Sequence, residues 1–158
     1  MRIPINLNDY KEPTTAPIGK YDILIASCDE AKTRAAGKPQ FVLSIGFEGH
    51  PEFQNMRHYL GIPSDMDDAD AMGFKALGLR RFLTLFGQPV PKDGLDTEQL
   101  AMQLVGARAK ADVILEKETD SQGNEKPDGR VFNRLVVPRL RDESQAAGAR
   151  VSPTPPKR

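Results

Sequence analysis

The sequence predicts a mainly β protein: a five-stranded Greek-key barrel of the OB type, with a helical insert between strands three and four. Two observations lead to this prediction. Three β-rich runs separated by short loops precede a long helical pattern, and two further β-rich runs follow the helices. A five-stranded OB barrel has this order of elements, although other small β-rich domains share it. We expect an N-terminal arm at 1–18, an OB-fold domain at 19–138 and a disordered basic tail at 139–158.

The first three strands are predicted at about 20–28, 40–48 and 53–62. The middle run gives the clearest signal, because apolar and polar side chains alternate along it with a period of two. Short loops separate the three runs, so we expect an antiparallel meander. The apolar positions of the middle run are Phe41, Leu43, Ile45 and Phe47.

A helical insert is predicted over about 62–87, where apolar residues recur at helical spacing. Aspartates gather where it begins, and we interpret them as caps of free amides rather than metal ligands. A shorter helix is predicted from Asp96 to Gly106, since Gln99 follows Asp96 in a capping-box-like pattern. The residues on the inward face of the first helix are predicted to be Met72, Ala76, Leu79, Leu83 and Phe86, and the aspartates are Asp65, Asp67, Asp68 and Asp70.

Composition indicates a soluble, globular chain, with 39% hydrophobic and 28% charged residues. No apolar run approaches the roughly 20 residues that span a bilayer, and no signal-peptide core is present, so we expect a cytoplasmic protein without a membrane partner. The single cysteine, Cys28, excludes an internal disulfide and is interpreted as a buried, inert thiol. The 22 basic and 22 acidic residues balance, which argues against coating nucleic acid by bulk charge but allows a local basic groove.

Catalytic motifs are missing from the sequence. There is no glycine-rich phosphate loop, no G-x-S-x-G and no H-E-x-x-H, and one cysteine cannot form a Cys-based zinc cluster. His50 is interpreted as a polar turn residue, and His58, in phase with Leu60, as a partly buried and hydrogen-bonded histidine. We therefore predict a protein that is not an enzyme, with no catalytic residues, metal site or cofactor.

Basic residues lie in the loops that flank the expected binding face. An OB barrel binds single strands across strands two and three, between the loop joining strands one and two and the loop joining strands four and five. The first loop, within 31–40, contains three cations and no carboxylate. In the second loop and its flanks, acidic residues dilute the cations. The loop residues predicted to contact nucleic acid are Lys32, Arg34, Lys38, Lys117 and Arg130.

Basic and aromatic residues also share faces on the later strands. The last two strands are predicted at 107–118 and 130–140, around a polar, turn-rich loop. Cations can track phosphates, and exposed rings offer stacking worth about 1–3 kcal/mol per base. The strand residues predicted to contact nucleic acid are Arg57 and Tyr59, Arg108 and Lys110, and Phe132 and Arg134.

Structural explanations compete with this interpretation at each position. The loop at 31–40 could be a solvated turn, and strand charges could discourage edge pairing. Tyr59 could cover the rim of the barrel, and Phe132 could pack under the helix. Each signal is weak alone, and their coincidence with the binding face of one fold favours the functional interpretation.

Several segments resemble a bacteriophage family of OB-fold single-stranded-DNA-binding proteins encoded among replication and recombination genes. They are "IGKYDILIASCDEAKTRAAGKPQFVLSIGFE", "LTLFGQPVP", "LVGARAKADVILEKE" and the asparagine of "VFNRLVVP", within about 18–138. The resemblance implies binding of the phage's unwound DNA in the cytoplasm of a bacterial host. It also implies that Lys32, Arg34 and Lys38 contact phosphates.

The functional hypothesis is therefore a sequence-tolerant single-stranded-DNA-binding protein that protects unwound DNA. The alternatives are a protein-interaction or recombination-accessory module, or a phage structural adaptor, on the same fold. Expected partners are single-stranded DNA and phage replication or recombination proteins, and a homo-oligomer is left open. The tail after Pro138 has five basic and two acidic residues, so added affinity for nucleic acid suits it better than imitation of an acidic tail.

Overall fold

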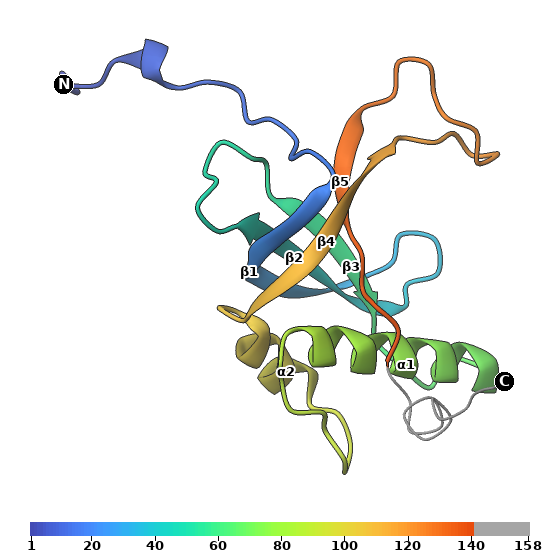
Figure 1. The fold of residues 1–158 in the computed structure, drawn as a ribbon. Coiled ribbons are helices and arrows are strands. Elements are labelled where there is room, and N and C mark those ends of the chain that lie inside the picture. The colour runs from blue at the N-terminus through green and yellow to red at the C-terminus, as the bar shows by residue number, and fades with distance from the viewer. Residues whose placement is uncertain (141–158) are drawn as a thin grey trace, which may run out of the picture.

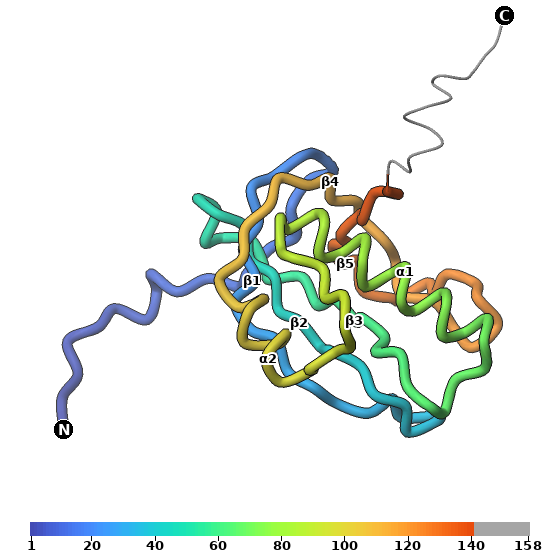
Figure 2. Tube along the Cα trace, turned by 90° about the horizontal axis from the view of Figure 1, so that it is seen from below, coloured from blue at the N-terminus to red at the C-terminus, as the bar shows by residue number. Residues whose placement is uncertain are grey.

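The computed structural model describes residues 1–140, so most of the predicted tail, residues 141–158, lies outside the described residues. The fold is mainly β, a five-stranded antiparallel sheet with two helices (Figure 1). The helices lie across one end of the strands (Figure 2). The elements are a 3-10 turn at Leu7–Asp9, β1 (Gly19–Lys32), β2 (Pro39–Phe47), β3 (Met56–Gly61), α1 (Ala69–Leu85), α2 (Thr97–Leu104), β4 (Arg108–Lys117) and β5 (Val131–Leu135).

The strands lie in the order β3-β2-β1-β4-β5. β1 is the central strand, pairing with β4 through its first half and with β2 along most of its length. Its pairing with β2 shifts register between Ile25 and Ser27, an irregularity that bends a strand and increases its twist. β1 continues to Lys32, beyond the predicted end at Cys28, because the polar residues after the bulge still pair with β2.

The sheet curves until its two edge strands face each other. β3 and β5 are at opposite ends of the strand order, yet residues of both line one groove. No ladder of hydrogen bonds joins β3 to β5 in the part of the chain that the structure describes, so the sheet is not closed.

The core lies between the concave face of the sheet and the helices. The alternation predicted for β2 is confirmed, since its four apolar side chains are all buried. β1 and β4 add alternating apolar residues, and α2 adds Leu100 and Leu104. The largest fully buried side chains are Phe41, Phe82, Ile23, Ile25, Leu43, Ile45, Leu83, Leu104 and Val113.

The inward face of α1 differs from the prediction in its first half. Leu79 and Leu83 are buried as predicted, but Met72 and Ala76 are exposed. Lys75 instead covers the sheet at this point, since a Cβ added to Gly61 would lie 3.2 Å from the Lys75 Cγ atom. The first half of α1 therefore meets the sheet through the stem of a lysine.

Two aspartates cap the helices as predicted. The Asp68 side chain accepts a hydrogen bond of 2.7 Å from the Ala71 amide at the start of α1. The Asp96 side chain accepts one of 3.1 Å from the Gln99 amide at the start of α2. Each carboxylate satisfies an amide that has no partner within the helix.

Asn133 holds the N-terminal segment against the sheet. Its side-chain oxygen accepts a 2.7 Å hydrogen bond from the Ala16 amide, and its side-chain nitrogen donates a 2.8 Å bond to the Ala16 carbonyl. Both residues are buried. Thr14 also pairs with the loop between β2 and β3, since its amide donates to the Glu52 carbonyl at 3.0 Å. Residues 1–13 project away from the body (Figure 1).

Candidate nucleic-acid interface

A groove of about 570 Å³ lies between β3 and β5. We call it the β3/β5 groove. It brings together four of the eleven residues predicted to contact nucleic acid, two from β3 and two from β5 or the loop before it. Those four are Arg57, Tyr59, Arg130 and Phe132, and the remaining lining residues are Thr15, Ser44, Gln54, Asn55, Met56, Glu118, Val131 and Asn133.

Strand alternation directs both rings outward. On β3 the Met56 and Leu60 side chains are buried, so Tyr59 between them points to the other side and is 56% exposed. On β5 the Asn133 side chain is buried, and Phe132 next to it is 43% exposed. Of the alternatives for Phe132, the structure shows a ring exposed in the groove rather than one buried under α1. Two flat apolar surfaces thus face solvent from opposite walls.

The groove also has a polar lining that the sequence interpretation missed. The Asn55 side chain donates a 3.1 Å hydrogen bond to the Ser44 hydroxyl, and a Cβ added to Gly46 would lie 3.1 Å from the Asn55 side-chain oxygen. Thr15 and Gln54 come from the N-terminal segment and the β2–β3 loop. Only the outward phase of Ser44 on β2 could have been found in the sequence, because curvature of the sheet brings the others in.

The arginines of the groove differ in their partners. Arg57 forms no ion pair within residues 1–140, and it pairs in register with Ser44 of β2. The Arg130 Nε atom lies 3.9 Å from the Glu118 carboxylate, which is also 3.4 Å from the Lys126 Nζ atom. The groove thus presents one unpaired cation and one cation beside an internal anion.

Arg108 and Lys110 lie elsewhere, on the outward face of β1 and β4, which we call the β1/β4 face. Arg108 lies 3.6 Å from Glu48, and Lys110 lies 3.8 Å from Asp22. The register places Asp22 directly opposite Lys110, so the antiparallel ladder itself produces the second pair. A third pair joins Lys20 and Asp112 at 3.4 Å. Neither Arg108 nor Lys110 lines the β3/β5 groove.

Arg134 and Lys117 are also engaged within the fold. Arg134 forms a 2.7 Å ion pair with Glu116 on the neighbouring strand. The Lys117 Nζ atom donates to the Pro127 carbonyl at 3.3 Å, within the β4–β5 hairpin. Their predicted contacts with nucleic acid would compete with these partners.

The hairpin between β1 and β2 is a short turn over 33–38. The Thr33 hydroxyl accepts a 3.1 Å hydrogen bond from the Lys38 amide, and Gly37 adopts a positive φ of 65° that favours glycine. Within the described residues, Lys32 and Arg34 form no ion pair. These two cations therefore remain available to an external anion.

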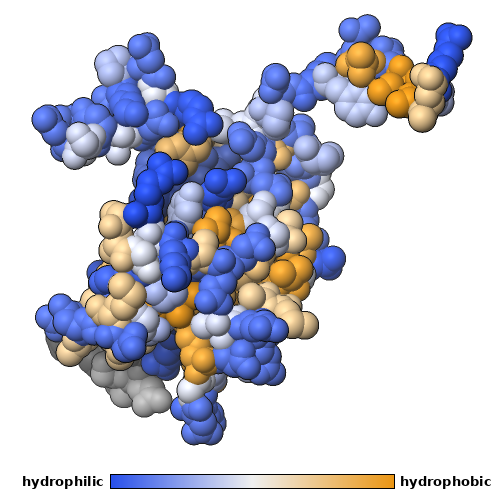
Figure 3. All heavy atoms as spheres, turned by 180° about the vertical axis from the view of Figure 1, so that it is seen from behind, coloured by the Kyte–Doolittle hydropathy of each residue, from blue (hydrophilic) through white to orange (hydrophobic). Residues whose placement is uncertain are grey.

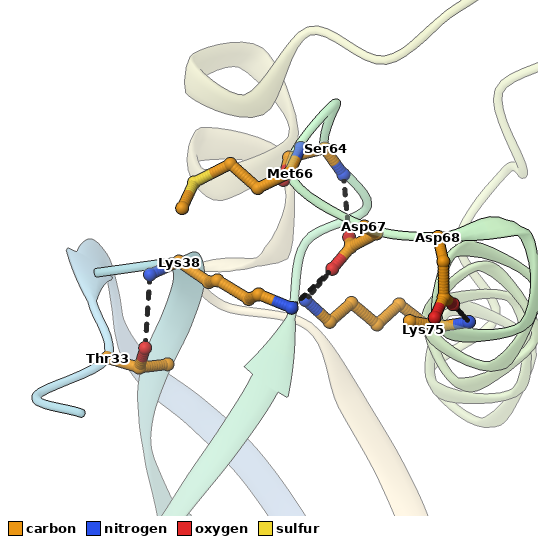
Figure 4. Close-up of polar contacts among 8 residues, drawn as sticks. Thr33, Lys38, Ser64, Met66, Asp67, Asp68 and Lys75 are labelled. Carbon is orange, nitrogen blue, oxygen red and sulfur yellow. Dashed lines mark hydrogen bonds and ion pairs between the residues drawn. The ribbon is translucent and has the colours of Figure 1, made fainter. Parts of the chain in front are cut away.

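Lys38 is held by the protein itself (Figure 4). Its Nζ atom lies 3.3 Å from Asp67 Oδ1, which also lies 2.7 Å from the Lys75 Nζ atom. The Ser64 amide donates to the other carboxylate oxygen at 3.0 Å. Lys75 is the main reason why the pKa of Asp67 falls to about 2, so this solvent-shielded carboxylate is ionised. Lys38 therefore ties the hairpin to the segment before α1, and Asp67 is an ion-pair partner rather than a helix cap.

The histidine and the cysteine considered for catalysis, His58 and Cys28, are partly buried, and burial shifts the pKa of each. His58 stacks on Phe82 with ring centroids 5.1 Å apart, and burial, with a smaller effect of Arg134, lowers its pKa to about 4. Its ring forms no hydrogen bond with the described part of the chain, so that part of the prediction is wrong. Burial, assisted by Asp29, raises the pKa of Cys28 to about 11. The imidazole is thus neutral and the thiol protonated at neutral pH.

Residues 1–140 contain no group of three or more His, Cys, Asp or Glu side chains that could hold a metal ion. None of the helices in that range is long and apolar enough to cross a bilayer. No family model matches the chain, and no curated protein matches it.

Proposed function

We propose that the protein is a non-enzymatic, sequence-tolerant single-stranded-DNA-binding protein whose strand lies in the β3/β5 groove. One observation carries the proposal: two exposed aromatic rings, Tyr59 and Phe132, line the same groove as Arg57 and Arg130. Rings of this kind stack on bases, with about 1–3 kcal/mol per base, and arginines neutralise the phosphates between them.

The groove suits a single strand better than a duplex. Bases in a duplex are stacked on one another, so their faces cannot reach Tyr59 or Phe132. The bases of a single strand can unstack and place their flat faces on these rings. Every base has a flat aromatic face, so the binding is tolerant of sequence. The hydroxyl and amide groups of Ser44 and Asn55 add hydrogen-bonding capacity along the strand.

We further propose that the curved sheet is an OB-type barrel with Greek-key connections. The strand order, the helical segment between β3 and β4 and the approach of β5 to β3 support this assignment. OB barrels bind oligonucleotides across strands two and three, between the loops joining strands one and two and strands four and five. The β3/β5 groove lies beside that face. Arg34 lies in the loop joining β1 and β2, and Lys32 is the last residue of β1 before it.

The biological setting we propose is protection of unwound phage DNA during replication or recombination, in the cytoplasm of a bacterial host. It rests on the motifs that resemble the phage family. The groove supports the proposal that the protein binds single-stranded DNA. The motifs are the basis for proposing that this binding takes place in phage replication or recombination.

The test is a titration of a thymidine 30-mer, followed by fluorescence anisotropy at two salt concentrations. Three cations form no ion pair within the described residues, Arg57, Lys32 and Arg34. They would neutralise about three phosphates, so the logarithm of affinity should fall with log salt at a slope of about −2. Duplex DNA of the same length should bind far more weakly, and an RNA 30-mer reports the preference between the two nucleic acids. No binding to the 30-mer at low salt would end the DNA proposal.

A protein-interaction module is the second candidate, because α1 carries exposed Phe74 and Leu77 on its outer face. On this alternative the 30-mer would not bind, whereas substitutions on α1 would abolish capture of a protein partner. The aromatic groove favours the first candidate.

A further inference from the structure

The part of the predicted N-terminal segment that projects from the body, residues 1–13 and here called the arm, carries large apolar side chains that nothing in the described chain covers. Its backbone hydrogen bonds are local, such as the one from the Tyr10 amide to the Leu7 carbonyl. Contact with the body begins only at Thr14. Figure 3 shows apolar spheres on the arm, standing clear of the body. The exposed apolar residues, each more than half accessible, are Met1, Ile3, Ile5, Leu7 and Tyr10.

The outer face of α1 carries a second uncovered apolar strip. Phe74 is 78% exposed, and Leu77, three residues later, is also exposed. They lie opposite the core face of the helix, which includes Leu79 and Leu83. The space beside the strip is open, since Cβ atoms added to the neighbouring Gly73 and Gly78 would meet nothing within 4 Å. An extended chain could therefore approach the helix closely here.

Charges occur in complementary order along the two surfaces. The arm runs from Arg2, through its apolar residues, to Asp9, whereas the strip on α1 runs from Asp70, through Phe74 and Leu77, to Arg80. None of these four charged residues forms an ion pair within the described part of the chain.

The lengths of the two surfaces also agree. The eleven helical residues from Asp70 to Arg80 span about 15 Å between their first and last Cα atoms. The arm from Arg2 to Asp9 spans at most about 23 Å if fully extended, and the 3-10 turn at Leu7–Asp9 shortens it. A parallel alignment thus places each charge near its opposite, with the apolar residues between them.

The arm and the strip belong to opposite ends of the molecule. The arm leaves the body beside the β2–β3 loop, at the opposite end of the strands from α1 (Figure 1). We propose that the arm of one copy binds the outer face of α1 on a second copy, head to tail. Because the two contacting surfaces differ, this association is heterologous and can continue along a row of copies. Such a row would place neighbouring protomers along one DNA strand, but the contact itself does not depend on DNA.

Sedimentation velocity of the full chain, from about 5 to 500 µM, tests the contact. We expect the average mass to rise with concentration. Ile5→Asp and Phe74→Asp should each weaken association by about tenfold or more, and both positions are exposed, so unchanged thermal melting should confirm the fold. An equimolar mixture of the two variants should form a heterodimer, since one supplies an intact α1 face and the other an intact arm.

A charge exchange tests the alignment. Arg2→Glu and Asp70→Arg should each weaken association, and a chain carrying both should regain it, whereas Asp93→Arg, at an exposed loop aspartate, should have no effect. A wild-type chain that stays monomeric throughout overturns the proposal. Association that survives Ile5→Asp would show that the arm does not make the contact, and a mixture that fails to pair would exclude head-to-tail docking. These results are independent of the DNA titration, which can fail or succeed separately.

Discussion

The β3/β5 groove and the β1/β4 face are both exposed strand surfaces with two predicted nucleic-acid-binding cations, yet their surroundings differ. On the β1/β4 face, Arg108 and Lys110 each lie beside a carboxylate, 3.6 and 3.8 Å away. In the groove, Arg57 has no such partner within the described residues, and two exposed rings accompany it. The number of basic residues on a strand does not distinguish the two surfaces. The two surfaces differ in whether the fold places a carboxylate beside each cation.

The exposed pairs of the β1/β4 face are individually weak, about 0–1 kcal/mol each. Their effect on binding is larger than this figure implies, because each carboxylate cancels the field that would attract a phosphate and would itself repel it. That face also lacks an exposed aromatic ring among the described residues of β1 and β4. Of the substitutions on these two surfaces, we therefore expect those in the groove to change DNA affinity and those on the β1/β4 face to leave it unchanged.

The largest expected effect is that of removing both rings. Tyr59→Ala with Phe132→Ala should weaken binding of a thymidine 8-mer by about 100-fold, since each ring contributes about 1–3 kcal/mol by stacking on a base. The salt slope should hardly change, because no cation is removed. Anisotropy titrations at two salts measure both quantities.

Phe74→Ala is the control, since it removes an exposed ring from α1, outside the groove. An 8-mer is short enough to hold a single protein, so any contact between protomers does not enter the measurement. Equal losses in the two variants would mean that the groove is not the binding surface.

The next largest effect distinguishes cations that have an internal ion-pair partner from cations that have none. Arg57→Ala should weaken binding about fivefold and flatten the salt slope by about 0.7, the value for one phosphate contact on a single strand. Lys110→Ala should change neither, because its charge is already balanced by Asp22. If both variants behave alike, internal ion pairing does not decide which cations bind.

A smaller effect, of opposite sign, is expected from a carboxylate that lines the groove. Glu118 lies within 4 Å of Arg130 and Lys126, so a bound phosphate must compete with it. Glu118→Gln should tighten binding about threefold and steepen the salt slope. Asp112→Asn removes the same charge from the β1/β4 face and is the control. Equal gains from both would show only a general effect of net charge.

The strands, the helix caps and the outward direction of Tyr59 could be predicted from the sequence because they depend on local periodicity. Three other features could not. The extension of β1 follows a bulge that interrupts the alternation. The pairing of Lys110 with Asp22 needs the register of two strands that are far apart in the chain. The convergence of β3 and β5 needs the curvature of the whole sheet, so only four of the predicted contacts meet in one groove.

The smallest effect on binding is expected from the ion-pair cluster that holds Lys38. Lys38→Ala and Asp67→Asn should lower stability while leaving DNA affinity within about twofold, unlike Lys32→Ala with Arg34→Ala, which should flatten the salt slope by about 1.4. Thermal or denaturant unfolding measures the first effect. A large loss of DNA affinity in Lys38→Ala with unchanged stability would mean that Lys38 contacts DNA, as the sequence predicted.

The pH dependence of Asp67→Asn has a defined sign. The pKa of Asp67 is lowered from 3.8 to about 2, so its carboxylate stabilises the fold at pH values above 3.8, and that stabilisation is lost as the pH falls through 2. The difference in the free energy of unfolding between wild type and variant should therefore be constant near neutral pH and shrink between about pH 4 and pH 2. A difference that grows on acidification would contradict the ion-pair assignment.

Photochemical crosslinking tests most directly whether the strand lies in the groove. A thymidine oligomer in which iodinated uracil replaces one base would be irradiated in complex with the full chain, and the crosslinked residue identified by mass spectrometry. The account predicts crosslinks to Tyr59 and Phe132, with none on the β1/β4 face. Crosslinks confined to Phe74, to the N-terminal arm or to β1 and β4 would contradict it.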